Sequence, residues 1–273
     1  MASPKLSCVV PGFKDPLIIP TVQSLLDSSE LGDQLEVIAV HDGYWLDKPL
    51  PQDPRVIEVH LGKNVGMRGA INAGIRVAKG EYLLRTDCHA TFGQGYDRIL
   101  TEQCEDNWIV TPRRYFLDPV KWEVMDIPPV DFMQLIISKI DDDNGGYTWK
   151  FFGKTKPGDD SQPIQESMAM QGSCWVMKHD WWDKVIGELQ TEGYDTHYQD
   201  SHEMVFKTWR AGGKLMVNKN TWHAHKHRDF PRTHGYGGEP ARKCFEYALK
   251  VWGDYYENEI APKWGVKVPK WRE

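Results

Sequence analysis

Alternating strand and helix signals fill the first ninety residues, and this pattern constrains the fold more than any other feature. Apolar runs typical of buried strands lie at Lys5–Pro11, Leu35–His41, Arg55–Leu61 and Glu81–Thr86. Helical patterns lie between them at Leu17–Leu26 and Val65–Lys79, and we expect Gly80 to cap the second helix at its C-terminus. Strands that alternate with helices predict an α/β fold with a mainly parallel, doubly wound sheet.

The middle of the chain, residues 112–167, shows a different pattern. It holds six prolines and the acidic run Asp141-Asp142-Asp143. We predict a helix over Val130–Ile140 and a long irregular loop over 141–167, because loops of that length are usually functional or disordered. The elements predicted after the loop are a strand at Ser173–Met177, a helix near Trp181–Leu189, a helix at Asp200–Ala211 and a strand at Lys214–Val217.

The composition is that of a globular protein in a reducing compartment. Hydrophobic residues make up 40% of the chain and charged residues 26%, which excludes disordered and fibrous classes. The five cysteines are odd in number and form no Cys-x-x-Cys, so we expect reduced thiols. The start, Met1–Lys5, lacks a signal-peptide pattern, and no apolar run reaches the ~18 residues of a membrane span. We therefore expect a cytoplasmic protein with no membrane association.

The charge is unevenly distributed along the chain. The net charge of −6 argues against a nucleic-acid partner. Residues 207–273, however, hold 14 Lys/Arg and 7 Asp/Glu, a net +7, which leaves −13 on residues 1–206. Such asymmetry is typical of a polyanion-binding face, and a solvated basic tail explains it equally well.

Polar clusters follow three of the predicted strands, where ligands of parallel sheets bind. These clusters are Pro11-Gly12-Phe13, Asp42-Gly43 and Asp87-Cys88-His89. Asp87 and His89 can face one cation, and oxygen with nitrogen ligation suits Mn²⁺ or a similar divalent ion. The alternative is a turn at the strand end whose polar groups are satisfied internally.

Three histidines alternate near the basic segment, at His223, His225 and His227. Alternate residues of an extended segment share one face, so this face offers metal ligands and, with the neighbouring Lys226 and Arg228, phosphate contacts. The alternative is a surface strand of solvated histidines.

Two further segments lie at predicted helix starts. In Asp200-Ser201-His202-Glu203, Asp200 or Ser201 suits an N-cap, and Asp200 or Glu203 alternatively suits a base near a reacting hydroxyl. In the segment 64–70, Arg68 stands where a helix N-terminus attracts anions and can lie over a nucleotide. Close packing of this glycine-containing helix against the sheet is the alternative.

The order of these segments resembles a known family. The stretches Gly66–His89, Met170–Met177, His202–Gly213 and His225–Arg228 resemble motifs of the polypeptide N-acetylgalactosaminyltransferases. These enzymes belong to the family 2-type glycosyltransferases with a GT-A fold, and the resemblance covers about residues 5–230. It implies a Rossmann-like GT-A fold with a mixed, mainly parallel sheet flanked by helices.

The resemblance also implies roles for individual residues. The implied metal ligands are Asp87, His89 and His225, for Mn²⁺ or Mg²⁺. The residues implied to bind the nucleotide-sugar are Pro11, Asp42, Arg68, Asp87 and Arg228. At the reacting centre the resemblance implies Asp200 and Arg228, and we also expect Glu203 there because of its place at the helix start. Two positions depart from the family pattern, since His41-Asp42 replaces paired acids and Asp200-Ser201 replaces a Glu-Asp pair.

The function predicted is metal-dependent transfer of a sugar from a UDP-sugar to a hydroxyl. We expect a GT-A domain over 1–230, with a nucleotide-sugar half at 5–111 and an acceptor half at 112–230, followed by a basic, aromatic C-terminal extension at 231–273. A non-catalytic module that binds sugar nucleotides or glycans is the alternative. The sequence predicts neither the sugar nor the oligomeric state.

The acceptor predicted is a hydroxymethylated pyrimidine in DNA, as in phage DNA modification, within a bacterial or phage-infected cytoplasm. The positive charge of 207–273 would meet phosphates, and aromatic side chains would stack on an extruded base. These aromatic residues are Trp222, Phe230, Tyr236, Trp252, Tyr255, Tyr256, Trp264 and Trp271. A glycan or protein hydroxyl is the alternative acceptor.

Overall fold

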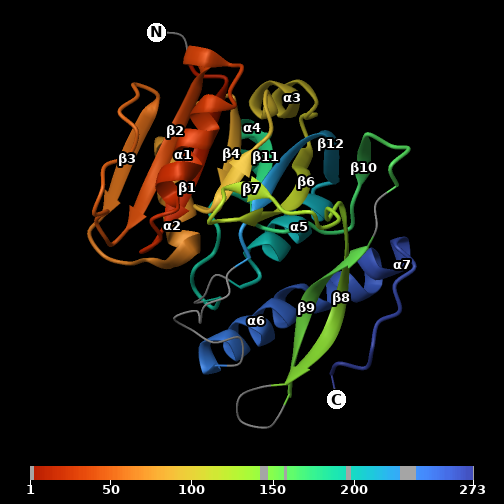
Figure 1. The fold of residues 1–273 in the computed structure, drawn as a ribbon. Coiled ribbons are helices and arrows are strands. Elements are labelled where there is room, and N and C mark those ends of the chain that lie inside the picture. The colour runs from red at the N-terminus through yellow and green to blue at the C-terminus, as the bar shows by residue number, and fades with distance from the viewer. Residues whose placement is uncertain (1–2, 142–146, 157–158, 195–197, 228–237, 273) are drawn as a thin grey trace.

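The computed structural model describes residues 3–141, 147–156, 159–194, 198–227 and 238–272 (Figure 1). One large mixed sheet forms the centre, with strand order β10-β12-β6-β11-β4-β1-β2-β3. Its strands are β1 (Leu6–Gly12), β2 (Leu35–Asp42), β3 (Val56–Leu61), β4 (Tyr82–Thr86), β6 (Trp108–Asp118), β10 (Ile164–Glu166), β11 (Cys174–Lys178) and β12 (Lys214–His225). The short strands β5 (Ala90–Phe92) and β7 (Glu123–Val124) pair with β12 and β6. The predicted α/β sheet is confirmed.

Helices cover both faces of the sheet. Helix α1 (Ile18–Asp27) and helix α2 (Gly66–Val77) supply apolar side chains to two different core clusters. Alternation along β1 explains the two clusters, because Val9 faces the α2 side whereas Cys8 and Val10 face the α1 side. The remaining helical segments are η1 (Gly32–Gln34), α3 (Tyr96–Glu102), α4 (His179–Trp181), η2 (Trp182–Ile186), α5 (Asp200–Arg210), α6 (Glu239–Tyr255), η3 (Tyr256–Ile260) and α7 (Ala261–Lys263).

Strands β1, β2, β3 and β4 run parallel, so their carboxyl ends meet at one edge. In this register Gly12 lies beside His41, and His41 lies beside His60. Strand β11 then runs antiparallel between β4 and β6, while β12 runs parallel to β6. This arrangement brings the end of β12 to the same region as the end of β4, although 139 positions separate Thr86 from His225.

Gly80 does not cap α2, contrary to the prediction. The helix ends at Val77, and Ala78 already has extended backbone angles, with φ −63° and ψ 140°. Gly80 is required for another reason, because a Cβ there would lie 2.5 Å from the backbone nitrogen of Ser7. The glycine therefore permits close approach of the α2–β4 connection to β1 rather than a left-handed turn.

The helix predicted over Val130–Ile140 is wrong, and so is the irregular loop over 141–167. Strand β8 (Phe132–Asp141) pairs antiparallel with β9 (Tyr147–Lys156) as a separate two-stranded sheet, and β10 follows. The buried residues Leu135 and Ile137 alternate, which is the period of a strand. A short apolar run fits either period, and its long-range packing decides between them.

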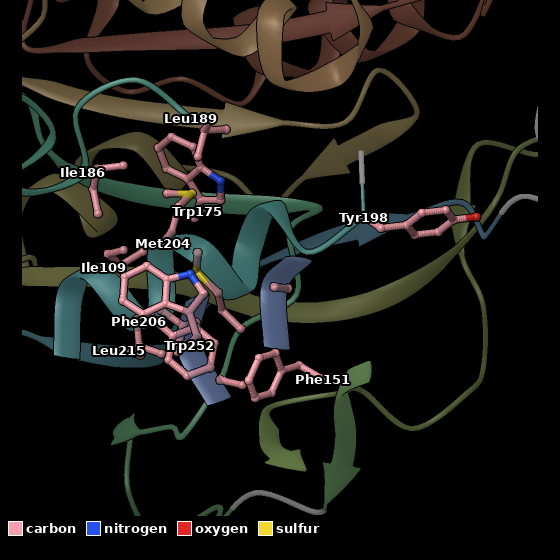
Figure 2. Close-up of a cluster of buried hydrophobic side chains, with 14 of the residues drawn as sticks. Ile109, Phe151, Trp175, Ile186, Leu189, Tyr198, Met204, Phe206, Leu215 and Trp252 are labelled. Atoms are coloured by element: carbon pink, nitrogen blue, oxygen red, sulfur yellow. The ribbon is translucent and has the colours of Figure 1, made fainter. Parts of the chain in front are cut away.

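The C-terminal segment packs into the core. Helix α6 lies along the β8–β9 hairpin (Figure 1). Trp252 stacks on Phe206 of α5 with ring centroids 5.2 Å apart (Figure 2). The ring of Tyr256 lies 5.3 Å from that of Phe151 of β9. Trp252 and Tyr256, predicted to stack on a base, are thus buried. The boundary predicted at residue 230 stays a prediction, while α6 belongs to the same core as α5.

Two helix and strand predictions in this half need adjustment. The helix near Trp181–Leu189 consists of the short α4 and one π-helical turn that ends at Ile186. The strand expected at Lys214–Val217 extends to His225 as β12 and carries two of the alternating histidines. Among the described residues, no helix has the length and apolar character needed to cross a membrane.

Candidate active site

The three side chains predicted to bind a metal meet at one point. Asp87 and His89 lie between β4 and β5, and His225 ends β12, where it pairs with Ala90. Their ligand atoms all lie within 4.8 Å of one another. The Nε2 atom of His225 is 2.9 Å from Asp87 Oδ2, and Nε2 of His89 is 3.9 Å from the same oxygen. Long-range pairing of the sheet therefore assembles one cluster from distant segments.

Asp15 supports this cluster from behind. Its Oδ2 lies 3.0 Å from Nδ1 of His89, and the carboxylate is buried. A carboxylate on one ring nitrogen fixes the ring orientation and leaves the other nitrogen for a metal, as is usual for histidine ligands. One carboxylate and two imidazoles form an oxygen and nitrogen donor set that suits Mn²⁺. Sequence reasoning missed Asp15, although it stands three residues beyond β1, where polar side chains were expected to gather.

Arg85 is a second group that sequence reasoning missed. Its Nη2 lies 2.5 Å from Asp87 Oδ1, and the side chain is buried in β4. Burial raises the pKa of Asp87, but Arg85 and the two histidines more than offset this and hold that pKa well below its usual range. Asp87 is therefore an anion at neutral pH. A charged residue within the apolar run Glu81–Thr86 was the available signal.

The alternating histidines diverge in the structure. His225 joins the cluster. Burial lowers the pKa of His225, although the contact with Asp87 opposes this effect. The lowered pKa favours the neutral ring, which is the form that binds a metal. His223 instead lies with Nε2 3.2 Å from Ser173 Oγ. His227 accepts a hydrogen bond from Arg114 at 2.5 Å. Only one of the three histidines is thus placed with Asp87 and His89.

Asp200 lies at the first turn of α5. Neither Asp200 nor Ser201 caps the helix, contrary to the prediction, because Gln199 occupies the N-cap position with φ 63° and makes no capping side-chain bond. A side chain at Gly172 would begin 3.5 Å from Asp200 Oδ1. The Gly172 carbonyl accepts a hydrogen bond from Arg85, the partner of Asp87. Gly172 therefore lies near Asp200 and also contacts Arg85, the partner of Asp87.

Arg68 and Glu203 form a buried ion pair with each other. Arg68 also donates to the carbonyls of Gln190 and Tyr198, at 3.1 and 3.0 Å. Glu203 also contacts Lys207 at 2.7 Å. The pair joins α2 to α5 and uses both side chains internally. The roles predicted for them, at the uridine and at the reacting centre, stay predictions that these contacts do not support.

Asp42 is also engaged by the protein. Its carboxylate accepts hydrogen bonds from the backbone of Val65 at 2.7 Å and of Gly66 at 3.0 Å, and from the amide of Asn64 at 2.9 Å. It thus satisfies the first N–H groups of α2. Burial raises the pKa of Asp42, while these backbone donors oppose the rise. Pro11 is buried within β1, and Arg228 lies outside the described residues.

A small pocket lies beside the cluster, between β6, β11 and β12. Its lining includes Arg114, Ser173 and His223. Its volume is about 20 Å³, which holds about one water molecule and excludes a sugar ring.

The fold defines a class, the glycosyltransferases with a GT-A-like fold. Residues 7–186 match the model of "Glycosyl transferase family 2". Because the match covers more than half of the chain, the protein belongs to glycosyl transferase family 2.

Curated relatives and a solved structure agree with this assignment. The chain is 26% identical over 243 residues to N-acetylgalactosaminyltransferase 6 of Drosophila melanogaster, covering 86% of this chain and 33% of the relative. It is 24% identical over 261 residues to polypeptide N-acetylgalactosaminyltransferase 4 of Mus musculus, covering 89% and 42%. The crystal structure of GalNAc-T7 with UDP, GalNAc and Mn²⁺ superposes with a TM-score of 0.70 at 17% identity, covering 95% of this chain and 50% of that one. The chain thus spans half or less of each of these relatives.

Proposed function

We propose that this protein is a metal-dependent glycosyltransferase that moves a sugar from a UDP-sugar to a hydroxyl group. The convergence of Asp87, His89 and His225 carries the proposal, because three donors of the right chemistry meet at the carboxyl edge of the sheet. The family assignment and the presence of UDP and Mn²⁺ in the similar GalNAc-T7 structure support it. A non-catalytic module that binds sugar nucleotides would hold the metal at the same cluster without releasing UDP, so turnover separates the two.

The chain's own residues hold the parts of the reaction in place. Asp87, His89 and His225 would bind Mn²⁺, and the ion would neutralise charge on the departing diphosphate. Asp15 orients His89, and Arg85 keeps Asp87 ionised and fixed. Asp200 stands beside Gly172 at the edge of the cluster, where its carboxylate can orient the sugar or an acceptor hydroxyl. Stabilisation of leaving-group charge would supply most of the rate enhancement.

Donor hydrolysis tests this proposal without knowledge of the acceptor. The full chain is incubated with a panel of UDP-sugars, with Mn²⁺ or with a chelator, and UDP release is measured. We expect release with at least one sugar that depends on the metal and is lost in Asp87→Asn. Equal release by the wild-type chain and the variant would show that the metal site is wrongly assigned.

For the acceptor, we propose a hydroxyl of a protein or glycan. The names of the curated relatives support this class, since one is a polypeptide N-acetylgalactosaminyltransferase. The DNA acceptor predicted from the sequence has lost part of its basis, because Trp252 and Tyr256 are packed in the core. Its remaining basis is the +7 charge of residues 207–273 and the other aromatic residues of that segment.

Product mass separates these acceptors. Peptides rich in Ser and Thr, free glycans and hydroxymethylated duplex DNA are each offered with the donor that the hydrolysis screen identifies. A sugar-sized mass gain on a peptide or glycan supports the proposal. A gain on DNA alone, with affinity that falls steeply between 50 and about 200 mM salt, would establish the polyanion acceptor instead.

A further inference from the structure

Arg114 occupies an unusual place for a cation. It lies on β6, directly beside His223 of β12, so its side chain is on the same sheet face as His223 and His225. Only 6% of the residue is exposed. The rings of His225 and His227 are 5.2 Å apart, and Arg114 contacts His227, so the guanidinium lies close to the metal-ligand strand end.

The guanidinium of Arg114 has no carboxylate partner in the part of the chain that the structure describes. Its polar contact there is the neutral Nε2 of His227, and its Nε has none. Burial lowers the pKa of Arg114 to about 10, which leaves the group charged at neutral pH. A buried charge without a counter-ion is unfavourable, and proteins retain one where a ligand supplies the opposite charge.

The preceding residue offers a direct contrast. Arg113 points to the other face of β6 and binds both oxygens of Asp131, at 2.9 and 2.6 Å, and Asp160 at 2.6 Å. Its charge is therefore neutralised within the protein. Arg113 is paired with carboxylates inside the protein, whereas Arg114 has no carboxylate partner among the described residues and stands next to the metal cluster.

The charges around the cluster indicate what the missing counter-ion is. The two carboxylates at the cluster are engaged elsewhere, since Asp15 contacts His89 and Asp87 contacts Arg85 and His225. A divalent ion on the three ligands would add further positive charge beside Arg114. The diphosphate of a nucleotide-sugar carries two negative charges and gains a third when the sugar leaves. We propose that Arg114 binds this diphosphate as a second cation beside the metal ion.

This inference rests on the proposed function, and ligand binding tests the two separately. Binding of UDP and of uridine to the full chain is measured by calorimetry with Mn²⁺ present, together with thermal unfolding. In Arg114→Met we expect UDP affinity to fall about tenfold or more, uridine affinity to stay unchanged and the unfolding temperature not to fall. Arg114→Lys keeps a positive charge, so its UDP affinity should lie between that of the wild-type chain and that of Arg114→Met.

Arg113→Met is the matched control on the adjacent position. Because it leaves Asp131 without its bidentate partner, it should lower the unfolding temperature and leave UDP affinity unchanged. This opposite pattern distinguishes ligand binding by Arg114 from a general loss of charge on β6.

Several outcomes would overturn the inference. Unchanged UDP affinity in Arg114→Met would remove the diphosphate contact. A lower unfolding temperature in Arg114→Met, with equal losses for UDP and uridine, would indicate an internal counter-ion instead. If Arg114→Met changed the KM for the acceptor and kept normal UDP affinity, Arg114 would bind an anionic group of the acceptor instead of the diphosphate. A wild-type chain that binds neither UDP nor uridine contradicts the proposed function, and the inference falls with it.

Discussion

Two polar clusters in the protein are both built around a buried carboxylate, and they differ in what remains available to a ligand. The Arg68–Glu203 pair between α2 and α5 is saturated, because Arg68 also binds two backbone carbonyls and Glu203 also binds Lys207. In the cluster of Asp87, His89 and His225, three ligand atoms converge within 4.8 Å. A saturated cluster holds elements together, whereas convergent lone pairs with oriented supports are typical of a ligand site.

We expect the largest effect, a loss of stability, when the Arg68–Glu203 pair is broken. Glu203→Gln leaves Arg68 buried without a counter-ion, so we expect a loss of about 3–5 kcal/mol in the free energy of unfolding. Denaturant unfolding measures this loss. The double variant Arg68→Met/Glu203→Leu removes both charges and should recover most of the stability. If Glu203→Gln kept normal stability and lost only donor hydrolysis, Glu203 would act at the reacting centre, as the sequence predicted.

Removing the metal-binding carboxylate gives the next effect. In Asp87→Asn we expect Mn²⁺-dependent UDP-sugar hydrolysis to fall about 100-fold or more, because the ion and its charge at the leaving group are lost. Steady-state UDP release measures the change. Asp53→Asn, at a partly exposed pair with Arg55 away from the cluster, is the control and should hydrolyse the donor normally. Full activity in the Asp87 variant would make this cluster a structural one.

A supporting residue should have a smaller effect than a ligand. Asp15→Asn keeps the shape at Nδ1 of His89 but removes the charge, so we expect Mn²⁺ affinity to fall about 10–100-fold while the three ligands remain. Titration with Mn²⁺, followed by paramagnetic resonance of the free ion, measures the affinity. If affinity is unchanged, Asp15 only caps the start of α1, where its Oδ1 accepts the N–H of Leu17.

The contrast between the clusters also shows what the sequence could predict. Asp87 and His89 were predictable as a pair because Asp-x-His follows a buried strand, which is a local pattern. The alternation alone offered three histidines, and the family resemblance singled out His225. The pairing of Arg68 with Glu203 was not predictable, because 135 positions separate the two residues and nothing local marks them as partners. Because the pairing could not be seen in the sequence, Arg68 was expected to contact the nucleotide and Glu203 to lie at the reacting centre.

The fold follows the same rule. The strands and helices up to Thr86 were predictable because each segment has one clear period. The strand β8 was not, because its apolar residues fit a helix as well, and its pairing with β9, on which α6 packs, decides. The aromatic residues of α6 and η3 gave a further error, since Trp252 and Tyr256 fill a core whose other wall, Phe151 and Phe206, lies elsewhere in the sequence.

The smallest effect concerns pH and a histidine between the two clusters. His202 lies on α5 next to Glu203 and bonds to Gln199, and burial lowers its pKa to about 4. The unfolded chain takes up this proton near pH 6.5, whereas the folded chain does so only near pH 4. Between these values the unfolded state binds more protons, so stability should fall as pH decreases from about 6.5 to 4. His202→Gln should flatten this slope, measured as the free energy of unfolding against pH. An unchanged slope would assign the pH dependence to other groups, such as His227, whose pKa burial also lowers to about 4.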